Sequence, residues 1–295
     1  MKNLNKRKKL SPEQITLIIN LIEANPQMTL LELSRELAFY RVTSISLSFL
    51  SRYLNCELIT MKRASFQLEN RNSEESKMKR YQYSEWFLTH QEYEFIFVDE
   101  FGFNFSTQRN YARSKEGQPA IVISPINAAV NTSVAMAISR KNGIIYFEDK
   151  KDAYNSDDFM IFLTNFCQVI HQMEINNPCI ILDHCPIHKM EDIDLISRFY
   201  GYYYKYLPPY SPMLNPIEEV IKDVKQNIKS QFADTLRSRI LNIKLLPKGS
   251  RSHERFRLLN TALHNSIDSQ KKKTIKTNFN SMMAKLPEAL GMLDL

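Results

Sequence analysis

The sequence is short of the features that mark secreted, membrane-spanning and zinc-finger proteins. Its four cysteines, Cys56, Cys167, Cys179 and Cys185, have no paired metal-binding spacing and are too few for a disulfide scaffold. No apolar run approaches the ~20 residues that a membrane-spanning helix needs, and the basic segment 1–9 lacks the apolar core of a signal peptide. We therefore expect a soluble protein in a reducing compartment that is not secreted and has no membrane partner.

Basic residues are scarce only in the middle of the chain. Hydrophobic residues make up 43% and charged residues 24%, which excludes collagen-like, mucin-like and mostly disordered proteins. The net charge of +7 divides into +6 over residues 1–80, −8 over 81–220 and +9 over 221–295. Basic flanks suggest a polyanionic partner, and an acidic centre suggests carboxylates that hold metal ions. Ordinary charge scatter is the alternative.

Three short helices are expected in the first 60 residues. The first starts at Ser11 and Pro12, the second begins at Thr29, and the third covers residues 44–54. The third helix carries small polar side chains and one arginine that could approach base edges in a major groove: Ser44, Ser46, Ser48, Ser51 and Arg52. The pattern is typical of a helix-turn-helix module, and a generic three-helix bundle is the alternative.

From residue 93 onward, strands and helices are expected in a different order. The apolar runs predict strands at 93–101, 132–139, 143–150, 179–183 and 202–208, and helices from Ser156 as cap, at 189–200 and at 215–232. Three consecutive strands followed by alternating units predict a mixed α/β sheet flanked by helices, similar to the RNase H-like fold. We expect four segments: a helix-turn-helix domain at 1–60, a linker or connecting helix at 61–92, the RNase H-like domain at 93–232 and a basic helical tail at 233–295.

Three carboxylates occur at strand ends or a helix start. Asp99 and Asp183 close two strands, and Glu218 lies in the first turn of a helix. Carboxylates that converge from neighbouring elements can hold hard divalent cations. Each also has a local explanation. An acid that ends a strand can simply be solvated, and Asn215 with Glu218 fits a helix capping box.

Four segments together resemble the DDE/D transposases of the mariner superfamily and the related bacterial insertion-sequence transposases. They are VDEFGF, RNYARSKEGQP, ILDHCPIHK and LPPYSPMLNPIEEVIKDVK. The match spans roughly residues 90–230, and 34 residues separate Asp183 from Glu218, as in the Asp-Asp-Glu members of that superfamily. The resemblance implies an RNase H-like catalytic domain preceded by a helix-turn-helix domain.

Carried over to this sequence, the resemblance assigns functions to individual residues. It implies that Asp99, Asp183 and Glu218 ligate two Mg²⁺ or Mn²⁺ ions, with Asn215 as a supporting residue. It implies a transposase that binds double-stranded DNA at transposon ends, cleaves it and joins it to a target, with TA as the suggested site. It also implies a homodimer or larger assembly on DNA. We expect the nucleus in a eukaryotic host and the cytoplasm or nucleoid in a bacterial one.

Two departures from the family keep other functions open. His184 stands where the family commonly has Asn, either as a tolerated polar donor or as a sign of decay, whereas His188 matches the family's His and either orients the site or is only a polar residue at a helix start. A zinc site at His184, Cys185 and His188 is disfavoured by its spacing. Complete relatives usually carry two helix-turn-helix units, and this sequence has room for one before residue 60. The alternatives are a transposase-derived DNA-binding protein with a truncated recognition region and decayed catalysis, and an RNase H-like nuclease.

Overall fold

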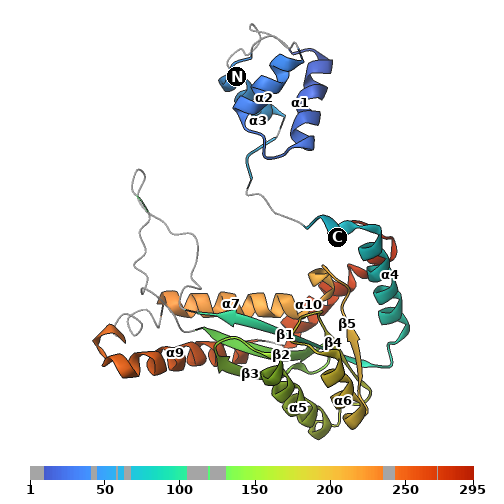
Figure 1. Cartoon of the computed structure of the whole chain (residues 1–295), viewed down its shortest axis with the longest axis vertical. Coiled ribbons are helices and arrows are strands. Elements are labelled where there is room, and N and C mark those ends of the chain that lie inside the picture. The colour runs from blue at the N-terminus through green and yellow to red at the C-terminus, as the bar shows by residue number, and fades with distance from the viewer. Residues whose placement is uncertain are drawn as a thin grey trace. The chain divides into compact units, whose positions relative to one another are not determined.

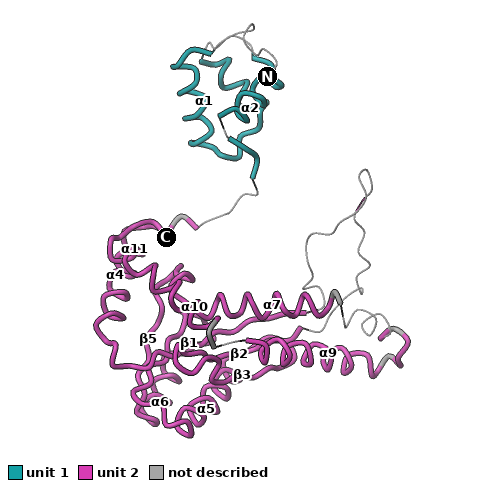
Figure 2. The backbone as a smooth tube through the Cα atoms, turned by 180° about the vertical axis from the view of Figure 1, so that it is seen from behind, with its two compact units in different colours: residues 1–66 teal, residues 67–295 magenta. Residues whose placement is uncertain are grey.

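The chain forms two compact units, residues 1–66 and 67–295 (Figure 2). The computed structural model describes residues 10–40, 45–57, 59–62, 68–104, 119, 131–234, 243–270 and 272–295. Ser44 and most of the segment 109–119 lie outside the described residues. The four-segment division expected from the sequence remains a prediction.

The first unit is all-helical. It contains α1 (Pro12–Ala24), α2 (Leu30–Phe39) and α3 (Leu47–Cys56). Each helix starts at a side-chain cap: Ser11 and Thr29 form capping boxes, and Ser46 accepts a hydrogen bond from the backbone N–H of Phe49. The apolar faces meet in one small core of Ile18, Leu33, Leu37 and Leu50. The expected small all-helical domain before the mixed α/β sheet is confirmed.

The second unit is built on a mixed five-stranded sheet. Its strands are β1 (Glu94–Phe103), β2 (Thr132–Ser139), β3 (Gly143–Lys151), β4 (Pro178–Leu182) and β5 (Tyr203–Tyr206), in the order β3-β2-β1-β4-β5. The first three strands pair antiparallel, while β4 and β5 run parallel to β1. Parallel neighbours need a crossover, which the two helices between β3 and β5 supply. The predicted RNase H-like mixed sheet is confirmed.

Helices cover both faces of this sheet (Figure 1). One face packs against α5 (Ser156–Gln172) and α6 (Met190–Tyr200). The other face packs against α4 (Glu74–Thr89), α7 (Ile217–Asp234), α9 (Lys248–Asp268) and α10 (Lys272–Met283). Shorter elements are η1 (Glu69–Asn72), η2 (Pro212–Leu214), η3 (Ile243–Leu245) and α11 (Leu286–Leu290).

Alternation along β1 divides the interior into two cores. Phe95 and Phe97 belong to the core under α7, α9 and α10, whereas Ile96 and Val98 belong to the core under α5 and α6. The predicted two-faced pattern of this strand is confirmed. Helices α9 and α10, which lie in the range expected to be a tail, contribute buried side chains such as Phe279 to the first core.

One predicted cap is wrong. We expected Ser156 to cap α5, but Asn155 does so. Its side chain accepts a hydrogen bond of 2.8 Å from the backbone N–H of Asp158, and the Asp158 carboxylate accepts one of 3.1 Å from the backbone N–H of Asn155. This reciprocal pair satisfies two N–H groups at the helix start, so Ser156 falls inside the first turn.

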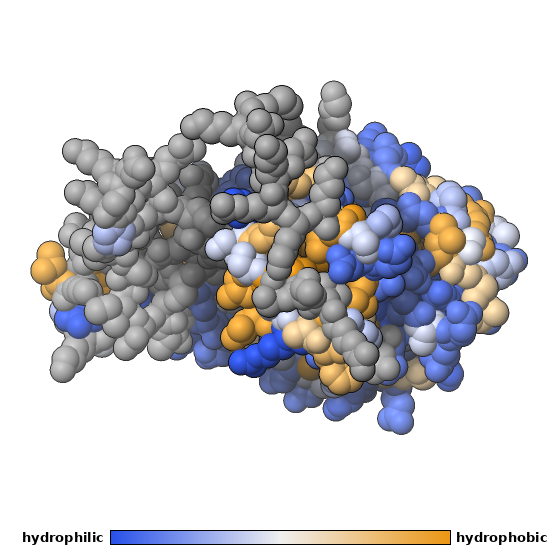
Figure 3. All heavy atoms as spheres, turned by 90° about the horizontal axis from the view of Figure 1, so that it is seen from above, coloured by the Kyte–Doolittle hydropathy of each residue, from blue (hydrophilic) through white to orange (hydrophobic). Residues whose placement is uncertain are grey.

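The surface is mixed in character. Figure 3 shows hydrophilic residues over much of the coloured surface, with smaller hydrophobic patches between them. Exposed apolar side chains include Phe39 and Phe199. Of the helices described, none is both long and apolar enough to cross a membrane.

Candidate active site

Two of the three predicted acids come from neighbouring parallel strands. In the β1–β4 ladder Phe97 pairs with Ile181, and both side chains lie in the same core. Asp99 and Asp183 each follow two residues later, so alternation directs both toward the same face of the sheet at the same edge. The hydrophobic pattern of two strands therefore brings two carboxylates together.

The third acid comes from the first turn of α7. This helix is held against the sheet by apolar residues at helical spacing, all buried: Ile217, Val220, Ile221, Val224 and Ile228. They match the apolar stripe expected from the sequence. Glu218 lies in the first turn of this helix, close enough to Asp99 and Asp183 for their charges to interact.

Burial and mutual repulsion act on the carboxylates of this group. Desolvation, followed by the charges of Glu218, Asp183 and Glu100, raises the pKa of Asp99 to about 8. The pKa of Glu218 is also raised: partial desolvation and the charge of Asp183 raise it more than the charge of Lys225 lowers it. Among the residues that the structure describes, no cation fully neutralises the negative charge that these carboxylates concentrate.

Asn215 supports Asp99 and does not cap α7. Its Nδ2 donates a hydrogen bond of 2.9 Å to Oδ2 of Asp99. Its side chain is buried, and its Oδ1 has no hydrogen-bond partner among the described residues, so it accepts nothing from the backbone of Glu218. The capping-box explanation of this segment is wrong, because the Asn215 side chain is used in a tertiary contact 116 residues away in sequence.

Both oxygens of Asp99 have a donor. Oδ2 accepts from Asn215, and Oδ1 accepts a hydrogen bond of 2.8 Å from the backbone N–H of Glu100. Each carboxylate oxygen has two lone pairs, so one bond each fixes the rotation of the carboxylate and leaves acceptor capacity on both atoms.

His188 lies buried behind Asp183. Its Nε2 is 3.0 and 3.1 Å from the two carboxylate oxygens of Glu100. Its Nδ1 is 3.0 Å from both the carbonyl oxygen and Oδ1 of Asp183, and the hydrogen-bond geometry favours the carbonyl. The ring of Phe159 packs 4.1 Å away between centroids. His188 thus joins β1 to the loop that carries Asp183.

This environment favours the charged form of His188. Burial alone disfavours an imidazolium, but the hydrogen bonds to Asp183 and Glu100 and the charge of Glu100 outweigh burial and raise the pKa of His188 to about 10. Both ring nitrogens are then donors at neutral pH. Glu100 was not among the residues singled out from the sequence as functional. The sequence did place Glu100 directly after Asp99 on the opposite face of the strand, and this position could have indicated a supporting role.

His184 lies outside this hydrogen-bonded group. It is exposed, and its ring stacks on Tyr206 with centroids 4.6 Å apart. The hydroxyl of Tyr206 donates to the carbonyl oxygen of His188 at 3.3 Å. His184 therefore packs against a residue that supports the loop between β4 and α6.

The predicted DNA-contacting residues of α3 differ in their surroundings. Ser48 and Arg52 are exposed one helical turn apart, and Nε of Arg52 donates to the carbonyl oxygen of Ser48 at 3.1 Å. Ser51 is half-buried, and Ser46 caps the helix. The exposed face of α3 thus presents Ser48 and Arg52 together.

The donor set suits a hard divalent cation. Carboxylate and amide oxygens are the ligands that Mg²⁺ and Mn²⁺ prefer, and in the part of the chain that the structure describes the buried Oδ1 of Asn215 has no partner. A cation would also relieve the repulsion that raises the pKa of Asp99. Within the described parts of the chain, no three His, Cys, Asp or Glu side chains are grouped closely enough to hold a metal ion as they stand. The acids are electrostatic neighbours and not a closed ligand shell.

A known protein family matches the region that contains the three acids. Residues 94–238 match the model of the DDE superfamily endonucleases, and this segment contains all three acids. The chain carries a DDE superfamily endonuclease domain. No curated protein sequence matches the chain.

Solved structures with a similar fold are complexes of the Mos1 mariner transposase. The paired-end complex with the left transposon end has a TM-score of 0.69 at 14% identity and covers 98% of this chain and 82% of the other. The strand transfer complex has a TM-score of 0.68 at 14% identity, covering 98% and 80%. The paired-end complex with Mn has a TM-score of 0.66 at 14% identity, covering 99% and 81%. Because the identity is only 14%, these matches show a shared fold and no more.

Proposed function

We propose that this DDE protein is a DNA transposase. It binds the ends of a mobile element as double-stranded DNA, cleaves the DNA and joins the freed 3′-hydroxyl to a target, for which TA is our candidate. The observation that carries the proposal is that Asp99 on β1 and Asp183 just after β4 each follow two residues behind the paired Phe97 and Ile181, with Glu218 interacting electrostatically with both. The DDE family match and the Mos1-like fold support it.

We assign the metal-holding role to the three acids. Asp99, Asp183 and Glu218 would hold two Mg²⁺ or Mn²⁺ ions, which when bound stabilise charge on the attacking and leaving oxygens of a phosphodiester. Asn215 fixes the rotation of the Asp99 carboxylate through its 2.9 Å hydrogen bond. His188, held by Glu100, fixes the backbone at Asp183. These residues position the acids, and positioning and electrostatics carry most of phosphoryl-transfer catalysis.

The helical unit is our candidate for recognition of the DNA ends. Ser48 and Arg52 lie on the exposed face of α3, which suits a helix that enters a major groove. The net charge of +6 over residues 1–80 provides attraction to phosphates. A single unit of this kind reads few bases, so we propose that a homodimer or larger assembly engages paired ends.

A cleavage and strand-transfer assay tests this function. The substrate is DNA carrying the inverted repeats that flank the gene, incubated with Mg²⁺ or Mn²⁺ and the full chain. We expect the parent protein to cut and join, and Asp183→Asn to lose about three orders of magnitude in rate or more. A parent protein no more active than Asp183→Asn would contradict the proposal.

A DNA-binding protein with decayed catalysis is the second candidate. Two observations favour it: the acids do not form a closed ligand group, and His184 stands where the family commonly has Asn. On this hypothesis the full chain still binds terminal-repeat DNA, yet neither Mn²⁺ binding nor cleavage depends on the acids. DNA binding measured beside the cleavage assay separates the two candidates.

A further inference from the structure

Helix α6 has an exposed apolar face. The helix lies beside α5 on one face of the sheet (Figure 1), where its Ile193 and Ile196 are buried. On the opposite side of the helix, Leu195 is 68% exposed and Phe199 is 81% exposed. These two residues are four apart, so their side chains are neighbours on the helix surface. Two large apolar side chains exposed next to each other indicate a contact surface for another molecule.

Two opposite charges border this apolar face on its Leu195 side. Glu191 and Arg198 are both exposed, and the seven residues between their positions correspond to about 20° of rotation and about 10 Å along the helix axis. They therefore lie on the same edge of the face but too far apart to pair with each other. In the part of the chain that the structure describes, neither side chain makes a hydrogen bond or an ion pair.

We propose that α6 binds α6 of a second copy of this chain as an antiparallel homodimer. A twofold axis at Leu195 sets this side chain against the partner's Leu195 and places both Phe199 rings beside the central pair. In such a pair, each edge of one helix meets the same edge of the other. Glu191 is four residues before Leu195 and Arg198 is three after it, so Glu191 and the partner's Arg198 lie within about 1.5 Å of the same level. The apolar face and its two charges are thus complementary to themselves, which commits the face to a second copy.

The contact is small, because one helix from each copy supplies it. A stable dimer buries ~800 Å² on each partner, which one face of an 11-residue helix does not reach. We therefore expect a dissociation constant of about 10 μM. Exposed ion pairs add little affinity but fix the orientation of the partners. The dimer requires neither DNA nor a metal ion, so it goes beyond the proposed function and is tested separately from it.

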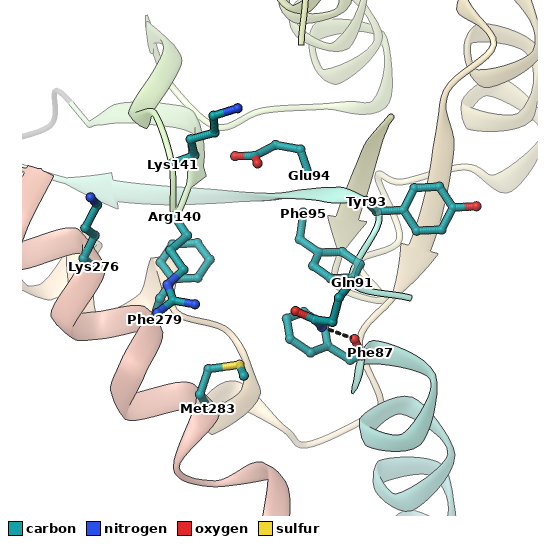
Figure 4. A pocket seen from close by; sticks show the side chains of 10 residues that line it. All are labelled: Phe87, Gln91, Tyr93, Glu94, Phe95, Arg140, Lys141, Lys276, Phe279 and Met283. Carbon is teal, nitrogen blue, oxygen red and sulfur yellow. Dashed lines mark hydrogen bonds between the residues drawn. The ribbon is translucent and has the colours of Figure 1, made fainter. Parts of the chain in front are cut away.

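A competing arrangement would use the cations of a pocket of about 420 Å³ at the start of β1 (Figure 4). Arg140 lines it from the turn between β2 and β3 and Lys276 from α10, and within the described segments neither is in an ion pair. The acids of α6 in one copy could contact these cations in the next copy. Such head-to-tail contacts form chains of copies unless they close into a ring, whereas antiparallel pairing of α6 stops at two. The antiparallel pair is favoured because it uses the apolar face and both charges together.

Analytical ultracentrifugation of the full chain, without DNA or divalent cations, measures the association. We expect a monomer–dimer equilibrium between ~1 and ~100 μM protein, and association at least about tenfold weaker in Leu195→Ser and in Phe199→Ser. Phe39→Ser is the matched control. Phe39 is 80% exposed and, like Phe199, makes an edge contact with the tyrosine that follows it, but it lies in the helical unit. This control should dimerise as the parent does.

Charge reversal tests the orientation of the two helices. Glu191→Arg alone and Arg198→Glu alone each place like charges opposite each other at both contacts, so each should weaken association about tenfold. The double variant should regain the parent's affinity, and a mixture of the two single variants should form mixed dimers. Lys276→Glu should leave the dimer unchanged. A chain that stays monomeric, larger assemblies that Lys276→Glu disrupts, or a double variant as weak as the single ones would overturn the proposal.

Discussion

Asp99 and Glu100 are adjacent carboxylates of one strand with opposite surroundings. Asp99 lies on the face shared with Asp183, where burial and neighbouring acids raise its pKa to about 8. Glu100 lies on the other face, where both oxygens contact a buried histidine whose pKa is raised to about 10. In the described segments no cation pairs with Asp99, whereas Glu100 pairs with His188. The difference shows how strand alternation can separate a candidate metal ligand from the residue that supports it.

The largest expected effect comes from neutralising Asp99. Asp99→Asn should reduce cleavage by about three orders of magnitude or more. At pH 9, above the raised pKa of Asp99, the same change should raise the melting temperature of the metal-free protein by ~3 °C or more, because it removes a buried, repelled charge. Cleavage assays and thermal unfolding in a chelator measure the two effects. Retained cleavage, or a lower melting temperature, would contradict the assignment of Asp99.

Neutralising Glu100, which pairs with His188, should have the opposite effect on stability. Glu100→Gln leaves the buried imidazolium of His188 without its counter-charge, so we expect the free energy of unfolding to fall by about 3 kcal/mol. Urea unfolding measures this loss. Glu92→Gln, at an exposed residue on the approach to β1, is the control. A Glu100→Gln protein as stable as the control would show that the histidine pair contributes little.

The two carboxylates should also differ in their effects on pH dependence without metal. Asp99 binds its proton more tightly in the folded state, so its contribution to stability is complete below pH 4 and is lost as the pH rises through about 8. The contribution of His188 is complete below pH 6.5 and is lost as the pH rises through about 10. Urea unfolding at pH 5, 7 and 9 should show that Asp99→Asn flattens the lower part of this decline and Glu100→Gln the upper part. Unchanged slopes in both variants would contradict these environments.

The smallest effect concerns Asn215. Asn215→Ala removes the hydrogen bond to Asp99 and should slow cleavage about tenfold. Asn215→Asp is the informative partner, since aspartate caps helices as well as asparagine does but cannot donate to Asp99. We expect Asn215→Asp to be less active than Asn215→Ala. Equal activity of Asn215→Asp and the parent in a single-turnover cleavage assay would restore the capping explanation.

The strands were predictable because local patterns determine them: alternating apolar residues define β1, and the short apolar run before Asp183 defines β4. The apolar stripe of α7 likewise fixes which residues of that helix are buried. These features depend on periodicity, which a single sequence contains. The grouping of the acids was predicted from the resemblance of four segments to the mariner-superfamily transposases.

The supporting contacts were harder to predict because they join distant segments. Nothing local to Glu100 or His188 shows that they meet, since 88 residues separate them. Asn215 was misleading for the same reason: its neighbours form a good cap, but a buried carboxylate across the fold uses its donor. At α5, two adjacent residues could cap the helix, and only the reciprocal contact between Asn155 and Asp158 decides between them.

The most direct test of the central claim is calorimetric Mn²⁺ binding by the full chain. We predict saturable binding by the parent protein, loss of that binding in Asp99→Asn, and retained binding in Glu100→Gln under conditions where that variant is folded. No Mn²⁺ binding by the parent, or equal binding by the parent and Asp99→Asn, would contradict the claim that Asp99 belongs to a metal-holding site and Glu100 supports it.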